Sequence, residues 1–335
     1  MKILTCTTPG QFDYNEGTQP EAQPGQAIIR IRRIGICGTD IHAFDGTQPY
    51  FTYPRILGHE LGAEFVAGDA PGFTPGEPVT IIPYFHCGTC IACRQGKPNC
   101  CVNMRVAGVH VDGGMREYFS VPASSLLHGN GLSIDELALV EPLSISAHGV
   151  RRADVKTGEY VLVIGAGPIG VGAMQFAKIA GAKVIAMDVN EKRLAFCKKI
   201  IGVDHTLLAG PDAEEQLRAI TNNDMPTVVI DATGNLKAIN HAFRYMAHTA
   251  RYVLIGLQKA EISFSHPEFH KREATLMSSR NATADDFNYV MKCIKEKLID
   301  PSAYITHRLQ FGEVASQFTS VVSSGEVMKA MIGID

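Results

Sequence analysis

The sequence lacks a large excess of charge of either sign, with 31 basic residues, 34 acidic residues and a formal net charge of −3. A nearly neutral chain offers no electrostatic basis for binding nucleic acid or a charged membrane surface. It also lacks internal repeats, and no apolar run approaches the roughly 18 residues that a membrane span needs. Residues 1–6 contain no hydrophobic segment of a signal peptide. We therefore expect a cytoplasmic protein without nucleic-acid or membrane partners, and its 335 residues suggest two domains.

Four of the nine cysteines form a compact cluster in which the intervals are two, two and seven residues: Cys87, Cys90, Cys93 and Cys101. In a cytosolic chain, clustered cysteines indicate metal binding rather than disulfides. Four thiolates can close a tetrahedron around zinc, which predicts a structural site. The spacing alone would also allow Cys100 in place of Cys101. An iron–sulfur cluster or redox thiols are the alternatives, which the absence of a ferredoxin-type spacing disfavours.

A second candidate metal site lies in the segment Gly-Ile-Cys37-Gly-Thr39-Asp-Ile-His42, followed by Gly-His59-Glu60. Thiolate, imidazole and carboxylate are zinc ligands, and three such ligands leave the fourth position open for water or substrate. The segment thus predicts a catalytic zinc site. The alternative is that Cys37 is a small buried apolar residue and His59 an ordinary loop histidine.

Residues 1 to about 145 contain short β-type segments, such as 27–32, 61–66 and 78–82, separated by Gly and Pro turns. This spacing of strands and turns predicts a partly open β-barrel or sandwich.

The pattern changes at the apolar run 160–164, which predicts a buried strand and leads directly into a GxGxxG motif at 165–170. A helix is predicted over 171–180, and the following strand, 182–187, ends at Asp188. This context predicts a dinucleotide site, in which Asp188 accepts hydrogen bonds from the adenosine ribose. The carboxylate would repel a 2′-phosphate, so NAD is favoured over NADP, although Lys192 and Arg193 nearby weaken that preference. Asp188 could instead cap a helix.

Further strands are predicted at 205–208, 227–231, 251–255 and 274–277, with helical stretches between most of them. Six such strands predict a doubly wound parallel sheet. A helix after Thr283, its expected N-cap, places a row of apolar residues on one face: Phe287, Val290, Met291, Ile294 and Leu298. The segment from about Tyr304 is expected to rejoin the first domain.

Three motifs follow one another along the chain: the Cys37–Glu60 segment, the four-cysteine cluster and the GxGxxG turn. In this order and spacing they resemble the zinc-dependent medium-chain alcohol/polyol dehydrogenases over essentially the whole chain. The sorbitol-dehydrogenase-like branch is the most similar. The segments 112–114, 140–143, 266–271 and 279–283 also resemble bacterial L-galactonate 5-dehydrogenases and related sugar-acid dehydrogenases.

The resemblance implies an α/β protein with a GroES-like β-barrel catalytic domain and a Rossmann domain. The expected boundaries are 1–145 for the catalytic domain, with a structural zinc lobe at about 86–102, 146–283 for the NAD-binding domain, and 284–335 for the segment that rejoins the catalytic domain. The family is usually dimeric or tetrameric, so a homo-oligomer is expected.

The resemblance also assigns roles to residues. Cys37 and His59 match ligands of the catalytic zinc, and either Glu60 or Glu141 supplies the third. Thr39 and His42 match a proton relay to solvent, although His42 could be a plain surface histidine, and Asp40 would orient the ligand histidine. The structural zinc ligands match Cys87, Cys90, Cys93 and Cys101, which selects Cys101 over Cys100. The expected coenzyme contacts are Gly165, Gly167, Pro168, Ile169, Gly170, Asp188, Arg193 and Arg280.

Arg280 could meet the pyrophosphate, the water at the zinc site or a substrate carboxylate, or form a structural salt bridge. The implied activity is hydride transfer from a secondary hydroxyl of a sugar acid or polyol to NAD, with zinc as the Lewis acid. A neutral polyol or threonine-type dehydrogenase is the alternative within this class. A non-catalytic NAD-binding regulator is the alternative from another class.

Overall fold

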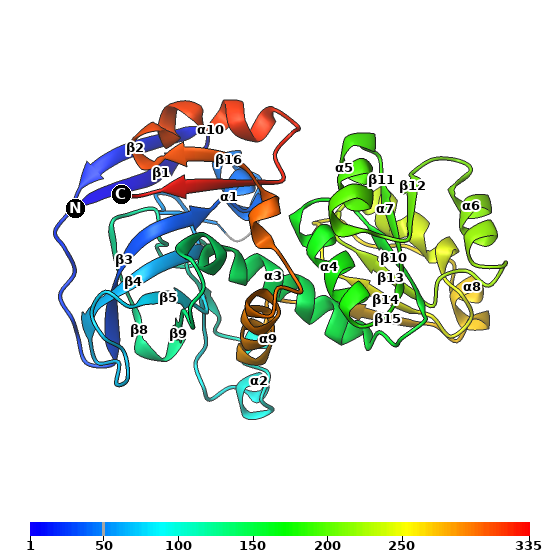
Figure 1. Cartoon of the computed structure of the whole chain (residues 1–335), viewed down its shortest axis with the longest axis horizontal. Coiled ribbons are helices and arrows are strands. Elements are labelled where there is room, and N and C mark those ends of the chain that lie inside the picture. The colour runs from blue at the N-terminus through cyan, green and yellow to red at the C-terminus, as the bar shows by residue number, and fades with distance from the viewer. Residues whose placement is uncertain (49–50) are drawn as a thin grey trace. The chain divides into compact units, whose positions relative to one another are not determined.

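The computed structural model describes residues 1–48 and 51–335, which divide into two compact units. The first, here called the β unit, comprises Met1–Pro142 and Thr283–Asp335, and the second, the α/β unit, comprises Leu143–Ala282. The division falls at Pro142, inside helix α3 (Ile134–Ala153). Figure 1 labels the elements along the chain. Among the described residues, no helix is both long and apolar enough to cross a bilayer.

The β unit is built around a curved sheet in the strand order β16-β17-β3-β4-β5-β9, with β8 also paired to β3. The strands of the whole β unit are β1 (Lys2–Thr8), β2 (Gln11–Glu16), β3 (Gln26–Gly35), β4 (Glu60–Gly68), β5 (Pro78–Ile81), β6 (Tyr84–Phe85), β7 (Arg105–Val106), β8 (Tyr118–Pro122), β9 (Leu126–His128), β16 (Ile305–Gln310) and β17 (Lys329–Gly333). Its helices, apart from the first part of α3, are α1 (Gly38–Phe44), α2 (Ile91–Arg94), α9 (Ala284–Lys295) and α10 (Val314–Ser323).

Strand β3 is the centre of this sheet because it pairs with β4, β8 and β17. Two register shifts between β3 and β4 bend the pair, as bulges do. One face of the sheet covers an apolar core that includes Ile29, Ile31 and Ile34, all fully buried. Strand β17, the last strand of the chain, lies directly beside β3.

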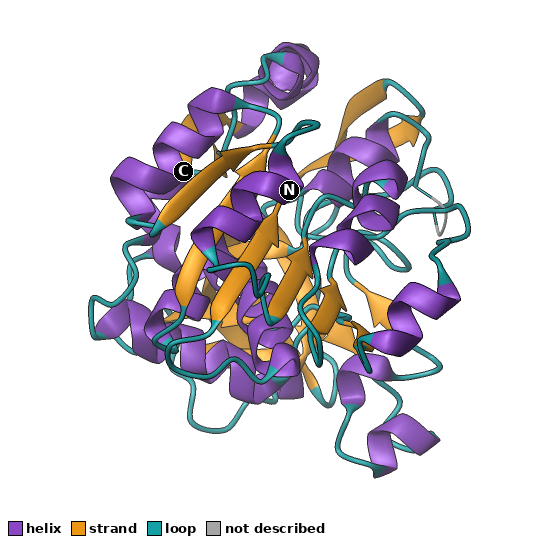
Figure 2. Ribbon diagram, turned by 90° about the vertical axis from the view of Figure 1, so that its right-hand side faces the viewer, coloured by secondary structure: helices purple, strands orange, loops and turns teal. Residues whose placement is uncertain are grey.

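The α/β unit contains a six-stranded parallel sheet in the order β12-β11-β10-β13-β14-β15, which helices flank in Figure 2. The strands are β10 (Tyr160–Ile164), β11 (Lys183–Asp188), β12 (His205–Leu208), β13 (Val228–Asp231), β14 (Arg251–Leu254) and β15 (Thr275–Ser278). The helices, apart from the end of α3, are α4 (Pro168–Ile179), α5 (Glu191–Phe196), α6 (Ala213–Ile220), α7 (Leu236–Ala242) and α8 (His266–Lys271). The prediction of a doubly wound sheet is confirmed. The order reverses between β10 and β13, and such a switch point is where dinucleotides bind.

Helix α4 begins at Pro168, three residues before the periodic segment 171–180, and proline fits its first turn because the N–H groups there need no intrahelical partner. One local prediction differs from the structure. Leu298 is 52% exposed and lies beyond the end of α9, so it does not belong to the apolar face of that helix. The helix ends at Lys295 with Glu296 as its C-cap, and Lys297 has a φ of 58°. Thr283 caps α9 as predicted, in a capping box with Asp286.

Candidate active site

The two halves of the Cys37–Glu60 motif meet because their strands pair. Cys37 follows β3 and is the N-cap of α1, whereas His59 and Glu60 stand at the start of β4. The ligand atoms of Cys37, His59 and Glu60 all lie within 4.8 Å of one another, and His59 and Glu60 are buried. Gly35 pairs with Glu60 across the two strands, and a Cβ atom on Gly35 would lie 2.0 Å from Glu60 Oε2. Only glycine therefore leaves room for this carboxylate.

Asp40 connects the two segments that carry these side chains. Its Oδ2 accepts a hydrogen bond from the Cys37 N–H at 2.9 Å, and its Oδ1 accepts one from the Gly58 N–H at 3.2 Å. The same Oδ1 lies 4.0 Å from His59 Nδ1, a buried atom without a hydrogen-bond partner among the described residues. This placement suits an imidazole that uses Nε2 for a metal and directs Nδ1 towards a carboxylate.

The electrostatics of the group favour a cation. Burial alone would lower the pKa of His59, but the negative charges of Cys37, Asp40 and Glu141 raise it well above its usual value. Surroundings that stabilise a positive charge on a buried imidazole would also stabilise a metal cation. Cysteine sulfur, histidine nitrogen and carboxylate oxygen form a zinc donor set with room for a fourth ligand. The residues present thus fit a catalytic zinc ion.

Glu60 has a buried counter-charge, which the sequence analysis did not identify. Lys329 Nζ, on β17, lies 2.6 Å from both carboxylate oxygens of Glu60 and donates to the Ile36 carbonyl at 3.1 Å. Burial would lower the pKa of Lys329, but the charges of Glu60 and Cys37 raise it instead. A lone lysine in the apolar segment 327–334 was the available signal, because lysine is seldom fully buried unless paired.

Glu141, on α3, is buried beside this group but is not part of the three-residue cluster. The hydroxyl of Tyr84, on β6, donates a hydrogen bond to Glu141 Oε1. Burial raises the pKa of Glu141 to about 7, while the charge of His59 opposes that shift. Burial and the charge of Glu141 also raise the pKa of Tyr84 well above its usual value, so the phenol remains a donor. On this geometry, Glu60 rather than Glu141 is the third candidate ligand.

The predicted relay residues lie on α1. Thr39 is half-buried in the first turn. His42 is exposed, and its Nδ1 lies 3.1 Å from Thr47 Oγ1. A half-buried hydroxyl and an exposed imidazole on one short helix are compatible with a proton path to solvent, and this role stays a prediction.

The four-cysteine cluster forms a second candidate metal site, around α2. The sulfurs of Cys90 and Cys93 are 3.5 Å apart, those of Cys87 and Cys101 are 3.5 Å apart, and those of Cys90 and Cys101 are 3.8 Å apart. Zinc–sulfur bonds of about 2.3 Å at tetrahedral angles require sulfurs roughly 3.8 Å apart, so the cluster fits zinc. Hydrogen bonds from Thr89 lower the pKa of Cys87 to about 5, which favours its thiolate. Cys100 is exposed and lies outside the cluster.

The glycine-rich turn of the α/β unit connects β10 to α4. Gly165 has a φ of 97°, and a Cβ atom on Gly170 would lie 1.7 Å from the Gly165 carbonyl oxygen. These two positions therefore require glycine for the turn and for close helix packing. A Cβ atom on Gly167 would meet no atom within 4 Å, so the backbone there is open to a pyrophosphate. Pro168 and Ile169 begin α4, and the N-terminus of this helix would stabilise the negative charge of the pyrophosphate.

Asp188, at the end of β11, is held beside this turn. Its Oδ2 accepts from the Ala166 N–H at 2.6 Å, and its Oδ1 accepts from the Asn190 N–H at 2.8 Å. Asn190, not Asp188, is the N-cap of α5, so the capping alternative for Asp188 is wrong. Arg193 is half-buried on α5, and Arg280 is exposed, two residues after β15.

A second loop at this edge of the sheet was missed in the sequence. Asp231, at the end of β13, accepts hydrogen bonds from the backbone N–H groups of Thr233 and Gly234, each at 3.1 Å. A Cβ atom on Gly165 would lie 2.9 Å from Thr233 Cγ2, so this loop adjoins the glycine-rich turn. The residues 231–234 (Asp-Ala-Thr-Gly) after a predicted strand were a detectable turn signal.

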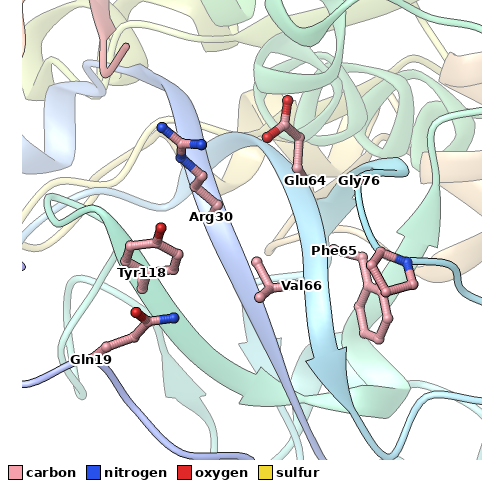
Figure 3. Close-up of a pocket in the computed structure, with 8 residues that line it drawn as sticks. Gln19, Arg30, Glu64, Phe65, Val66, Gly76 and Tyr118 are labelled. Atoms are coloured by element: carbon pink, nitrogen blue, oxygen red, sulfur yellow. The ribbon is translucent and has the colours of Figure 1, made fainter.

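A cavity of about 260 Å³ on the β unit is shown in Figure 3. It lies over β3, β4 and β8, and Arg30, Glu64 and Tyr118 are among its lining residues. None of the lining residues is a cysteine or histidine, so we do not place the reaction there.

Comparisons with known proteins identify the family of the chain. The family model for zinc-binding dehydrogenases matches residues 168–296, and the alcohol dehydrogenase GroES-like domain matches residues 23–130. An L-galactonate-5-dehydrogenase of Escherichia coli K12 is 41% identical, covering 99% of this chain and 98% of that protein. A sorbitol dehydrogenase of Halalkalibacterium halodurans is 28% identical, with 99% of each chain covered.

Among solved structures, a protein described as a short chain alcohol dehydrogenase (rspB) from E. coli CFT073, complexed with NADH, matches with a TM-score of 0.92 at 29% identity. The match covers 100% of this chain and 99% of that chain. The chain belongs to the zinc-binding alcohol dehydrogenase family with a GroES-like domain, and its cofactors are zinc and NAD.

Proposed function

We propose that this enzyme oxidises a secondary hydroxyl of a sugar acid of the L-galactonate type, with NAD as the hydride acceptor. The observation that carries the proposal is the convergence of Cys37, His59 and Glu60 in one buried group that fits zinc with an open position. The choice of a sugar acid is supported by the 41% identity to an L-galactonate-5-dehydrogenase over nearly the full length of both chains.

In this mechanism Cys37, His59 and Glu60 hold the metal, and Asp40 orients His59. Zinc, when bound, supplies a Lewis acid that lowers the pKa of the substrate hydroxyl. Thr39 accepts the proton that the hydroxyl loses, and His42, which is exposed, passes it to solvent. Glu141 provides a buried carboxylate beside the group, and Lys329 neutralises Glu60.

In the α/β unit, the open backbone at Gly167 and the N-terminus of α4 receive the coenzyme pyrophosphate. Asp188 accepts hydrogen bonds from the ribose and disfavours a 2′-phosphate. NAD supplies the hydride acceptor. We assign Arg193 to the coenzyme, and Arg280 to the coenzyme or to a substrate carboxylate.

A neutral polyol is the second candidate substrate, which the likeness to a sorbitol dehydrogenase favours. The two candidates differ in one chemical group, the carboxylate, which needs a cation in the pocket. A threonine-type substrate is a further member of this class. A purely regulatory NAD-binding protein would have no need for Cys37, His59 and Glu60 in one buried group.

The test is NAD reduction by the zinc-loaded enzyme with L-galactonate, other aldonates, sorbitol, galactitol, threonine and ethanol, and with Cys37→Ser as the control. Turnover confined to aldonates supports the proposal. Turnover on neutral polyols alone contradicts the sugar-acid assignment while retaining the zinc chemistry. If the protein binds NAD but shows no Cys37-dependent turnover on any of these compounds, the result favours a regulatory protein.

We also propose that the enzyme is a homo-oligomer in the cytoplasm. Strand β15 is an edge of the parallel sheet. Two exposed apolar residues are found here: Leu276 lies on β15, and Leu257 lies in the loop after β14. An edge of this kind is suited to pairing with a second copy. Light scattering after size-exclusion chromatography tests this assignment, and a monomer at micromolar concentration contradicts it. The reducing cytoplasm suits the four thiolates of the zinc lobe.

A further inference from the structure

The hydroxyl of Tyr84 donates a hydrogen bond to the buried Glu141, and nothing in the proposed chemistry uses this hydroxyl. The phenol ring is 5% exposed and packs edge-on against Phe287 of α9, with ring centroids 6.1 Å apart and an interplanar angle of 75°. Strand β6 fixes its backbone through pairing with β7, where Tyr84 faces Val106. The hydroxyl is therefore held in place from two sides, and it donates to Glu141 Oε1.

The two buried carboxylates beside the zinc ligands are tethered differently. Both oxygens of Glu60 contact Lys329 Nζ at 2.6 Å, and Glu60 is within the group that can hold a metal. Glu141 feels the charges of His59 and Glu60, yet it is outside that group, and Tyr84 donates to one of its oxygens. Glu60 thus has a counter-charge in direct contact, whereas the direct contact of Glu141 is with a neutral donor, and Lys329 acts on it only through its charge.

We propose that Tyr84 is a positioning residue that holds Glu141 out of the metal's ligand set and so keeps the fourth coordination position available to substrate. This inference rests on the proposed metal site at Cys37, His59 and Glu60. A buried carboxylate oxygen that loses its donor is costly to leave unpaired. The charge of His59, a candidate metal ligand, already acts on Glu141, so without the phenol we expect the carboxylate to move onto the metal.

The variant that isolates this role is Tyr84→Phe, because it keeps the ring and its packing on Phe287 and removes only the hydroxyl. A fourth protein ligand closes the open position, so the variant loses its catalytic metal to a chelator more slowly than the wild type does. Its kcat falls about 10-fold or more, with a smaller change in KM. A purely structural hydroxyl would lower the melting temperature without changing either the metal's ligands or its retention.

Cobalt(II) substitution reports the ligands directly, because the visible d–d bands of cobalt shift when a carboxylate takes the place of water among its ligands. The signal of the catalytic site is the difference between each protein and its Cys37→Ser counterpart, which removes the contribution of the four-cysteine lobe. Tyr252→Phe is the matched control, since Tyr252 is fully buried in the α/β unit and its hydroxyl donates to the Ile239 carbonyl at 3.2 Å. We expect shifted bands for Tyr84→Phe and a wild-type spectrum for Tyr252→Phe.

Two further proteins make the test decisive. Glu141→Gln should keep the wild-type cobalt spectrum, because Glu141 is not a ligand while Tyr84 holds it. The double variant Tyr84→Phe/Glu141→Gln should return towards that spectrum, because the carboxylate that moves is gone, and this non-additivity shows that Tyr84 acts through Glu141.

The outcomes separate this inference from the proposed function. A wild-type spectrum and metal retention in Tyr84→Phe would overturn the role of Tyr84 alone. If Tyr84→Phe does not fold, Glu141→Gln still decides, since a changed spectrum there means that Glu141 is already a ligand and the inference is wrong. If wild type and Cys37→Ser bind the same amount of cobalt, the proposed metal site is wrong, and the inference about Tyr84 is wrong with it.

Discussion

Lys329 and Glu60 form a buried ion pair across 269 positions of the chain, with the ammonium nitrogen 2.6 Å from each carboxylate oxygen. Lys329 is 3% exposed and Glu60 is fully buried. The pair links the last strand of the chain to the first residue of β4, where the candidate zinc ligands stand. The integrity of the catalytic group therefore depends on the C-terminal segment.

Replacing Lys329 with Met should leave the Glu60 carboxylate buried without its counter-charge. Breaking one side of a buried pair costs about 3–5 kcal/mol, so the melting temperature and the retention of catalytic zinc should both fall. The double variant Lys329→Met/Glu60→Gln should recover much of the stability but not the turnover. Calorimetry and zinc analysis measure both effects, and an unchanged melting temperature in the single variant would contradict the account.

Gly35→Ala should displace the Glu60 carboxylate, because the added Cβ would lie 2.0 Å from Oε2. We expect kcat/KM to fall about 10- to 100-fold, with faster loss of zinc to a chelator. Gly38→Ala is the control in the same segment, since a Cβ there meets no atom within 4 Å. Equal activities for the two variants would count against Glu60 as a ligand.

Replacing Asp188 with Ser should shift coenzyme preference towards NADP, because it removes the negative charge that disfavours a 2′-phosphate. The ratio of kcat/KM for NADP to that for NAD should rise about 10- to 100-fold, which corresponds to roughly 1.4–2.8 kcal/mol. Asn190→Ala removes the cap of α5 without a charge change, and should lower stability while leaving the ratio as it is. An unchanged ratio in Asp188→Ser would contradict the assignment of Asp188 to the adenosine ribose.

Asp135 should make stability depend on pH. Burial raises its pKa, but the hydrogen bonds and charges of Arg308 and Arg33 outweigh that and lower it overall. A lowered pKa in the folded state stabilises the protein above the unfolded value of about 4, and this contribution is lost as the pH falls through the folded pKa. Asp135→Asn should therefore lose about 0.5–1 kcal/mol at pH 7 and less at pH 3. Urea denaturation at both pH values checks this, and a pH-independent difference would contradict it.

Sequence patterns sufficed where the chemistry is local in the chain. The GxGxxG turn and Asp188 are 18 to 23 residues apart and belong to one βαβ unit, and the confirmed parallel sheet followed from the same run of strands. The four-cysteine lobe was also visible, since its members span 15 residues.

The parts of the candidate site that depend on strand register could not be read from the sequence. Gly35 opposes Glu60 only because β3 and β4 pair in one register, and Lys329 meets Glu60 only because β17 joins the same sheet. Tyr84 occurs in a two-residue strand, which gives no periodicity to indicate which way its side chain points. The choice between Glu60 and Glu141 as a ligand candidate likewise needed the coordinates.

The most direct test of the central claim is the zinc content per chain, measured together with NAD reduction on L-galactonate. Wild type should hold two zinc ions and turn over, and Cys37→Ser should hold one and be inactive. Cys93→Ser should lose the other zinc and much of its stability. Two zinc ions in Cys37→Ser, or turnover that survives the substitution, would contradict a catalytic zinc at Cys37, His59 and Glu60.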